Sequence, residues 1–130
     1  MKEEIIRQLR SCFLIKEERL PVIEVILPIS SINNELISVF VQEYEGEFVV
    51  DDAGWLLDGE YGEIHKNTNV ERIRKLYGID RRNFTTDSFE ITVENEIDIP
   101  GAILDLATFI FAVLTDSTIK FDEENNPDCE

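Results

Sequence analysis

Cysteine and histidine are scarce in this sequence, which holds two cysteines and one histidine among 130 residues. Cys12 falls on the apolar side of an expected helix and Cys129 lies near the end of the chain. We therefore expect free thiols in a reducing compartment rather than a disulfide. A zinc site takes about four nitrogen or sulfur ligands, and His65 has too few partners to build one.

The common catalytic signatures are also missing. The sequence has no GxSxG nucleophile motif, no P-loop, no GxGxxG fingerprint and no cysteine with a histidine nearby. We therefore assign no catalytic residue and expect no cofactor. These absences favour a protein that is not an enzyme.

Targeting and membrane signals are lacking as well. No uninterrupted apolar run reaches the ~18 residues that a membrane span needs. The N-terminal stretch "MKEEIIRQLRSCF" carries acids at Glu3 and Glu4 and no small-residue cleavage site, unlike a signal peptide. We expect a cytoplasmic protein with no membrane partner.

Positive charge is scarce and very unevenly distributed along the sequence. The formal net charge is -16, and residues 21–65 hold ten acids and no Lys or Arg. A surface of this kind repels DNA and anionic membranes and attracts basic protein surfaces. The bases gather instead in residues 66–82 and are Lys66, Arg72, Arg74, Lys75, Arg81 and Arg82. Such bases can contact phosphates, but in so acidic a chain we expect them to offset the acidity, internally or across a dimer, and we expect no direct nucleic-acid partner.

The pattern of apolar residues predicts an α+β fold. The 43% hydrophobic content suits one domain with a sizeable core. Helical and alternating periodicities predict a helix, three strands, two short helices, a strand and a helix. These are expected at 2–14, 22–30, 35–44, 48–51, 53–59, 69–78, 88–95 and 99–116. We expect an antiparallel sheet of about four strands with the N- and C-terminal helices packed on one face, in a single domain of residues 1–121 followed by an acidic disordered tail, 122–130.

The last predicted helix is apolar on nearly all sides. From Ile103 to Leu114 only Asp105 and Thr108 are polar. Such a helix is buried in the core or packs against a second chain. We expect this helix to lie in the core, and the alternative is a homodimer that forms through it. The residues concerned are Leu106, Phe109, Ile110, Phe111 and Val113.

The stretch "EFVVDDAGWLLDG" offers two adjacent carboxylates, Asp51 and Asp52, at the end of a strand. Carboxylate oxygens suit Mg²⁺ or Ca²⁺, which makes the pair weak metal candidates and the centre of an alternative hypothesis, a small metal-dependent enzyme. The carboxylates that could complete the site are Asp58, Glu60 and Glu63. However, adjacent strand residues point to opposite faces. We therefore favour Asp52 as the cap of a short helix and Gly54 as its turn residue.

The same stretch carries a resemblance to a known family. An apolar strand, a "VFV…FVVDDAG" hairpin, a "WLLDG" segment, an "RIRKLYGI" helix and a long apolar C-terminal helix are similar to domain-of-unknown-function family 1828. The match covers residues 22–120, and its most specific part is the turn at residues 51–54. The resemblance implies a bacterial or bacteriophage setting and brings no activity.

The leading hypothesis is a non-enzymatic acidic module that binds a protein with a basic surface. Its specific form is a phage-type inhibitor of a host defence nuclease, with anti-CRISPR or anti-restriction action, that imitates the charge of a nucleic acid. The other alternative, besides the metal-dependent enzyme, is a dimeric accessory module. The residues expected to contact the partner are Glu43, Glu45, Glu47, Asp51, Asp58, Glu60 and Glu63.

Overall fold

The computed structural model describes residues 3–19, 22–30, 35–54, 56, 69–83 and 87–125. Within these ranges, six strands form one antiparallel sheet in the order β1-β2-β3-β4-β6-β5. The elements are α1 (Glu3–Cys12), β1 (Leu14–Arg19), β2 (Val22–Ser30), β3 (Leu36–Tyr44), β4 (Glu47–Asp51), α3 (Val70–Tyr77), β5 (Asp80–Asn83), β6 (Asp87–Val93), the 3₁₀ turn η1 (Glu96–Asp98) and α4 (Ile99–Asn125).

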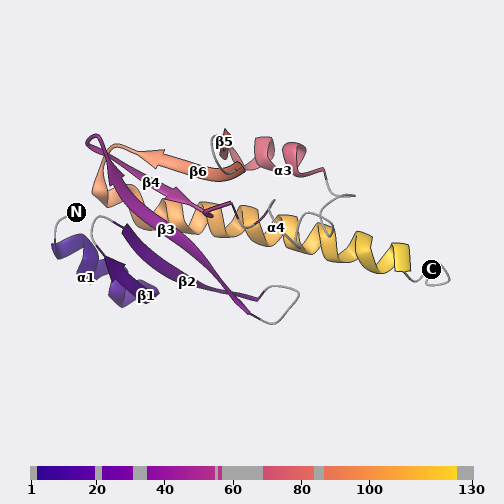
Figure 1. The fold of residues 1–130 in the computed structure, drawn as a ribbon, viewed down its shortest axis with the longest axis horizontal. Helices are drawn as coiled ribbons and strands as arrows, with labels where there is room; N and C mark the ends of the chain where they lie inside the picture. Colours follow the sequence, from indigo (N-terminus) through magenta and orange to yellow (C-terminus); the bar gives the residue numbers. More distant parts are fainter. Residues whose placement is uncertain are drawn as a thin grey trace.

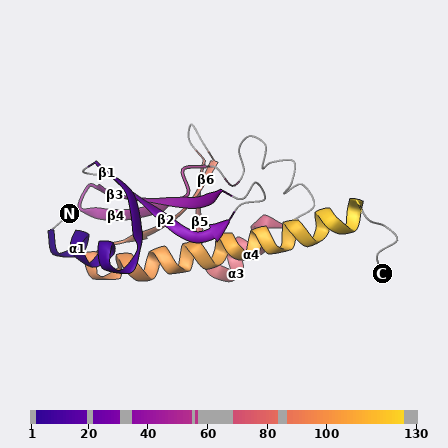
Figure 2. The ribbon, with the colours of Figure 1, turned by 90° about the horizontal axis from the view of Figure 1, so that it is seen from below.

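The molecule has two layers. The sheet forms one layer. The helices α1, α3 and the long α4 form the second layer, on one face of the sheet, as Figures 1 and 2 show together. Helix α4 contacts β2, β4 and β6, and α1 contacts β1. The α+β class and the placement of both terminal helices on one face are therefore confirmed.

The central hairpin of β3 and β4 follows from alternation. Ile37, Val39 and Val41 are buried on one face of β3, while the residues between them are half-buried on the other. The connection is the two-residue turn Glu45–Gly46, in which both residues have positive φ, 51° and 80°. This geometry matches the right-handed twist of the flanking strands, and a glycine at its second position adopts it without strain.

The sheet has two more strands than the expected four, and both are edge strands. β1 has the sequence LIKEER and β5 has DRRN. Neither sequence alternates, because an edge strand packs fewer side chains and often carries charges that discourage pairing with other chains. The first helix also ends at Cys12 rather than at residue 14, since Leu14 already pairs with Ile26 of β2.

The core lies between the sheet and α4. Phe109 of α4 meets Phe89 of β6 edge to face, with ring centroids 4.9 Å apart. Phe111, two residues further along, is 58% exposed. Four of the five residues weighed for core or dimer are fully buried: Leu106, Phe109, Ile110 and Val113. The homodimer stays a prediction. Leu104 and Phe111, on the outward side of α4, are the exposed apolar residues that could contact a second copy.

Helix α4 is longer than expected. It runs to Asn125 and so includes residues 122–125 of the expected tail, while residues 126–130 lie outside the described part of the chain. The segment Glu96–Asp116 is long and apolar enough to cross a membrane by length and composition, and 44% of an 18-residue window within it is buried inside the protein. The core helix of a soluble protein meets the same criterion, so the segment is weak evidence for a membrane span.

Candidate functional site

Asp52 lies fully buried at the turn that follows β4. Its Oδ1 accepts hydrogen bonds from the backbone N–H groups of Phe89 at 2.9 Å and Gly54 at 3.0 Å, and its Oδ2 accepts one from Leu56 at 3.4 Å. The backbone N–H of Asp52 in turn donates to the carbonyl of Phe89. The Asp52 carboxylate thus closes the turn. Together with the Asp52 N–H, it also adds the pair Asp52–Phe89 to the pairing between β4 and β6.

The turn itself is not the start of a helix. Ala53 and Gly54 have positive φ, 55° and 82°, which a right-handed helix does not allow. The side chain of Asp52 therefore holds a left-handed turn, for which a glycine at position 54 is the natural residue. Of the short helix expected at 53–59, residues 55 and 57–59 lie outside the described part of the chain.

Asp51 points to the other side of the sheet. Its carboxylate accepts from the Gln42 side chain at 3.0 Å and from the Ala53 N–H at 2.9 Å. It pairs across the strands with Glu90, whose carboxylate forms an ion pair with Arg82 at 3.0 Å. Burial raises the pKa of Asp51, opposed by its hydrogen bonds and by Arg82. Strand geometry thus separates the two adjacent aspartates.

Burial also raises the pKa of Asp52, to about 6, although its three N–H donors oppose the shift. The nearby charge of Asp51 adds to the rise. Because the pKa in the folded protein lies above the ordinary 3.8, the folded state keeps a proton that the unfolded chain releases between these values. This contribution to stability is complete below pH ~4 and is lost as the pH rises through about 6.

We expect the free energy of unfolding to fall by up to about 3 kcal/mol between pH 4 and pH 7 because of Asp52. Burial of Asp51 and Glu90 raises their pKa values and acts in the same direction. The Asp52→Asn variant has no proton to lose at this position. Its free energy of unfolding should therefore fall less steeply with pH than that of the wild type, in denaturant titrations at several pH values. Asp105→Asn removes the same charge from an exposed position and should keep the slope. Equal slopes for the two variants would contradict the assignment to Asp52.

Arg74, Arg81 and Arg82 form ion pairs around α3 and β5. Glu71 accepts from Arg74 at 3.1 Å and from Arg81 at 2.6 Å, and these hydrogen bonds lower its pKa. Arg74 also donates to the carbonyl of Ile79 at 2.6 Å, just after the glycine that ends α3. Much of this basic segment therefore balances acids within the molecule. Its first member, Lys66, lies outside the described residues.

Several expected contact residues cannot be placed. Asp58, Glu60 and Glu63 lie outside the described ranges, as does His65, which was considered only as a zinc ligand. Within those ranges, no group of three or more Asp, Glu, His or Cys side chains is arranged to hold a metal ion. The structure thus does not bring Asp51 and Asp52 together with further described ligands.

One group of exposed acids gathers at one end of the molecule. The β3–β4 turn, the end of β6 and the first turns of α1 and α4 lie at the same end in both ribbon views (Figures 1 and 2). Exposed carboxylates come there from the hairpin, from α1 and from the segment between β6 and α4. They are Glu3, Glu4, Glu43, Glu45, Glu47, Glu94 and Asp98, with Glu96 half-buried. We call these eight residues the acidic end. Asp51, four residues along β4 from Glu47, lies roughly 13 Å away by the strand rise and does not belong to it.

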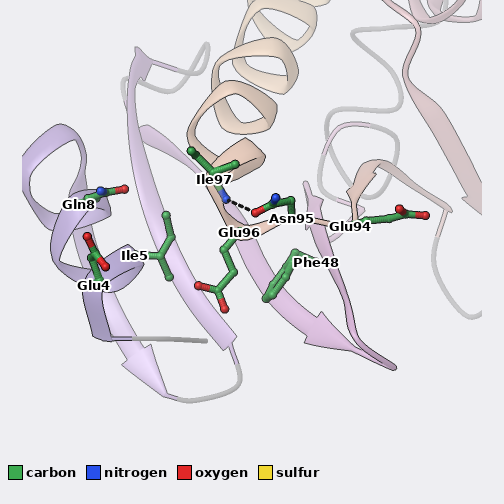
Figure 3. A pocket seen from close by; sticks show the side chains of 8 residues that line it. All are labelled: Glu4, Ile5, Gln8, Phe48, Glu94, Asn95, Glu96 and Ile97. Atoms are coloured by element: carbon green, nitrogen blue, oxygen red, sulfur yellow. Dashed lines mark hydrogen bonds between the residues drawn. The ribbon is translucent and has the colours of Figure 1, made fainter.

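A cavity of about 630 Å³ opens within the acidic end. Figure 3 shows Ile5 of α1, Phe48 of β4 and Ile97 of η1 around it, with Glu96 between Ile5 and Phe48 and with Glu94 turned away. The Ile97 N–H donates to the side-chain oxygen of Asn95 at 3.2 Å, which fixes η1 at the mouth. The residues that line the cavity are Glu4, Ile5, Gln8, Phe48, Glu94, Asn95, Glu96 and Ile97.

The sequence alone pointed to the hairpin glutamates but not to this cavity. Its walls come from α1, β4 and η1, which lie far apart in the sequence, and only the fold brings them together. One signal was visible: Ile97 is an apolar residue in the acidic stretch "ENEID". An apolar side chain there has no role in the alternation of β6, and it is 73% exposed.

Comparisons with known proteins give no relative: no family model, no curated protein and no solved structure matches the chain. The resemblance to family 1828 therefore stays a prediction.

Proposed function

We propose that this protein is a binding module that captures a partner with a basic surface through its acidic end. The observation that carries the proposal is the gathering of carboxylates from three segments of the chain at one end of a sheet. Strand pairing and the tight Glu45–Gly46 turn fix the hairpin part of this surface. A fixed array of like charges speeds the encounter with an oppositely charged partner and favours one orientation.

Not every acid in the sequence contributes to this surface. Asp52 and Glu90 are buried, and Asp51 is half-buried with its carboxylate held by hydrogen bonds. The partner surface is therefore shorter than the row of acids in the sequence. The specific form of the proposal, an inhibitor that occupies the nucleic-acid channel of a defence nuclease, rests on the acidic end alone.

Charge reversal at the hairpin tip tests the proposal. We expect the triple variant Glu43→Lys, Glu45→Lys, Glu47→Lys to lower the affinity for a Lys- and Arg-rich peptide at least tenfold. The wild-type affinity should also fall steeply between about 0.01 M and about 1 M salt, where the Debye length shrinks from about 30 Å to about 3 Å. Fluorescence anisotropy with a labelled peptide measures both effects.

The matched control reverses three exposed acids away from the acidic end: Glu35→Lys, Asp80→Lys, Asp105→Lys. Its net charge equals that of the hairpin variant, so a loss of affinity caused by overall charge would be the same in both. Equal losses, or no salt dependence in the wild type, would contradict the proposal.

A further inference from the structure

The cavity at the acidic end is suited to more than charge. Apolar side chains from three different elements, Ile5, Phe48 and Ile97, line it, and the described lining residues include three glutamates and no basic residue. Ile5 and Phe48 belong to the core of the protein and give the cavity a fixed floor. Ile97 is held at the mouth by η1 with 73% of its surface exposed.

We propose that this cavity binds an apolar side chain of the partner that is flanked by Lys or Arg residues, so that the ligand is a cationic amphipathic segment. This inference rests on the proposed function and specifies its ligand. The apolar anchor would cover Ile97 and the floor, while the flanking cations would meet Glu4 and Glu96. Apolar burial gives such a contact a specificity that charge alone does not supply.

The size and charge of the cavity favour this ligand over others. A volume of about 630 Å³ accommodates one or two side chains together with the backbone that carries them. The glutamates repel phosphates and carboxylates, which excludes anionic ligands. A second copy of the chain is disfavoured, because two molecules that each carry a net charge of -16 repel each other.

The other candidate surface on the described part of the chain is less complete. A cavity of about 430 Å³ beside α3 is lined by Arg72, Lys75 and the exposed Leu76, with Asn69 and Glu71. The five described residues that line it all belong to one helix and its cap. The acidic-end cavity is instead built from three elements that the fold holds in place.

Two Lys-rich peptides of equal length and charge test the inference. One carries a single central Leu and the other has Ser at that position. We expect the Leu peptide to bind the wild-type protein about tenfold more tightly than the Ser peptide, since burial of a Leu side chain supplies this much. Titration at low salt, followed by fluorescence anisotropy, gives both dissociation constants.

Ile97→Ser should remove most of this preference while leaving the affinity for the Ser peptide unchanged. The high exposure of Ile97 means that the fold does not depend on it, and thermal unfolding checks this point. Leu104→Ser replaces a 57% exposed residue on α4, outside the cavity, and should keep the preference. A second variant, Gln8→Trp, adds bulk at the exposed wall of the cavity and should weaken binding of the Leu peptide in particular.

The outcomes separate the inference from the proposed function. If both peptides bind the wild type equally and with strong salt dependence, the cavity inference fails and the proposed function stands. If neither peptide binds at low salt, both fail. A Leu preference that survives in Ile97→Ser places the apolar contact elsewhere and overturns the inference. Self-association that Ile97→Ser abolishes would identify a second copy as the occupant and would overturn it as well.

Discussion

Replacing Asp52 with Ala should destabilise the protein by about 3 to 4 kcal/mol. The substitution leaves the N–H groups of Gly54, Leu56 and Phe89 without the carboxylate that accepts from them. A buried donor that loses its acceptor keeps the full cost of its removal from water, about 1 to 3 kcal/mol. Denaturation by guanidinium at pH 7 measures the loss.

Asp51→Ala is the matched control for this variant. Asp51 is the adjacent aspartate, but its carboxylate is only half-buried. The Ala53 N–H, from which this carboxylate accepts a hydrogen bond, is exposed to water. Water can replace this acceptor, so we expect a loss of about 1 kcal/mol. A loss for Asp52→Ala no larger than for Asp51→Ala would show that the Asp52 carboxylate does not anchor the turn.

Phe109→Ala should cost about 3 to 5 kcal/mol of stability. Phe109 is fully buried, and its ring packs edge to face against Phe89 of β6. The substitution removes apolar surface from the core, leaves a cavity and also ends the aromatic contact. The free energy of unfolding from denaturant titration gives the magnitude.

Phe111→Ala provides the same chemical change two residues away. Its ring is 58% exposed, so we expect a loss below about 1 kcal/mol. The ratio of the stability losses of the two variants depends on which side of α4 faces the sheet. Similar losses for both would contradict the orientation of the helix described above.

The elements with strong periodicity were predictable from the sequence. Strand β3 alternates buried and half-buried residues before a tight turn, and α3 begins after Asn69 and ends at Gly78 as its capping residues predict. β1 and β5 were not predictable, because edge strands bury few side chains and leave no apolar alternation. Each of them pairs with the strand that follows it in the sequence, as Arg82 beside Ser88 shows, so it is the missing apolar pattern that hid them.

The candidate site was predictable only in part. The hairpin glutamates follow directly from the sequence and a tight turn. The separation of Asp51 from Asp52 was expected from strand geometry, but the partner of Asp52 in the fold, Phe89, lies 37 residues away and had no local signal. The cavity needed the fold for the same reason, because a surface made of three distant segments exists only when they pack together.

Mapping of backbone amide chemical shifts during titration with the Leu-containing Lys-rich peptide would locate the binding surface on the molecule. We expect the largest changes at the cavity and the hairpin tip, in α1 at Glu4 to Gln8, at Phe48 and at Glu94 to Ile97. Residues on the outward side of α4, including Leu104 and Phe111, should change little. Changes centred on α3 or on α4, or no saturable change at low salt, would contradict binding through the acidic end.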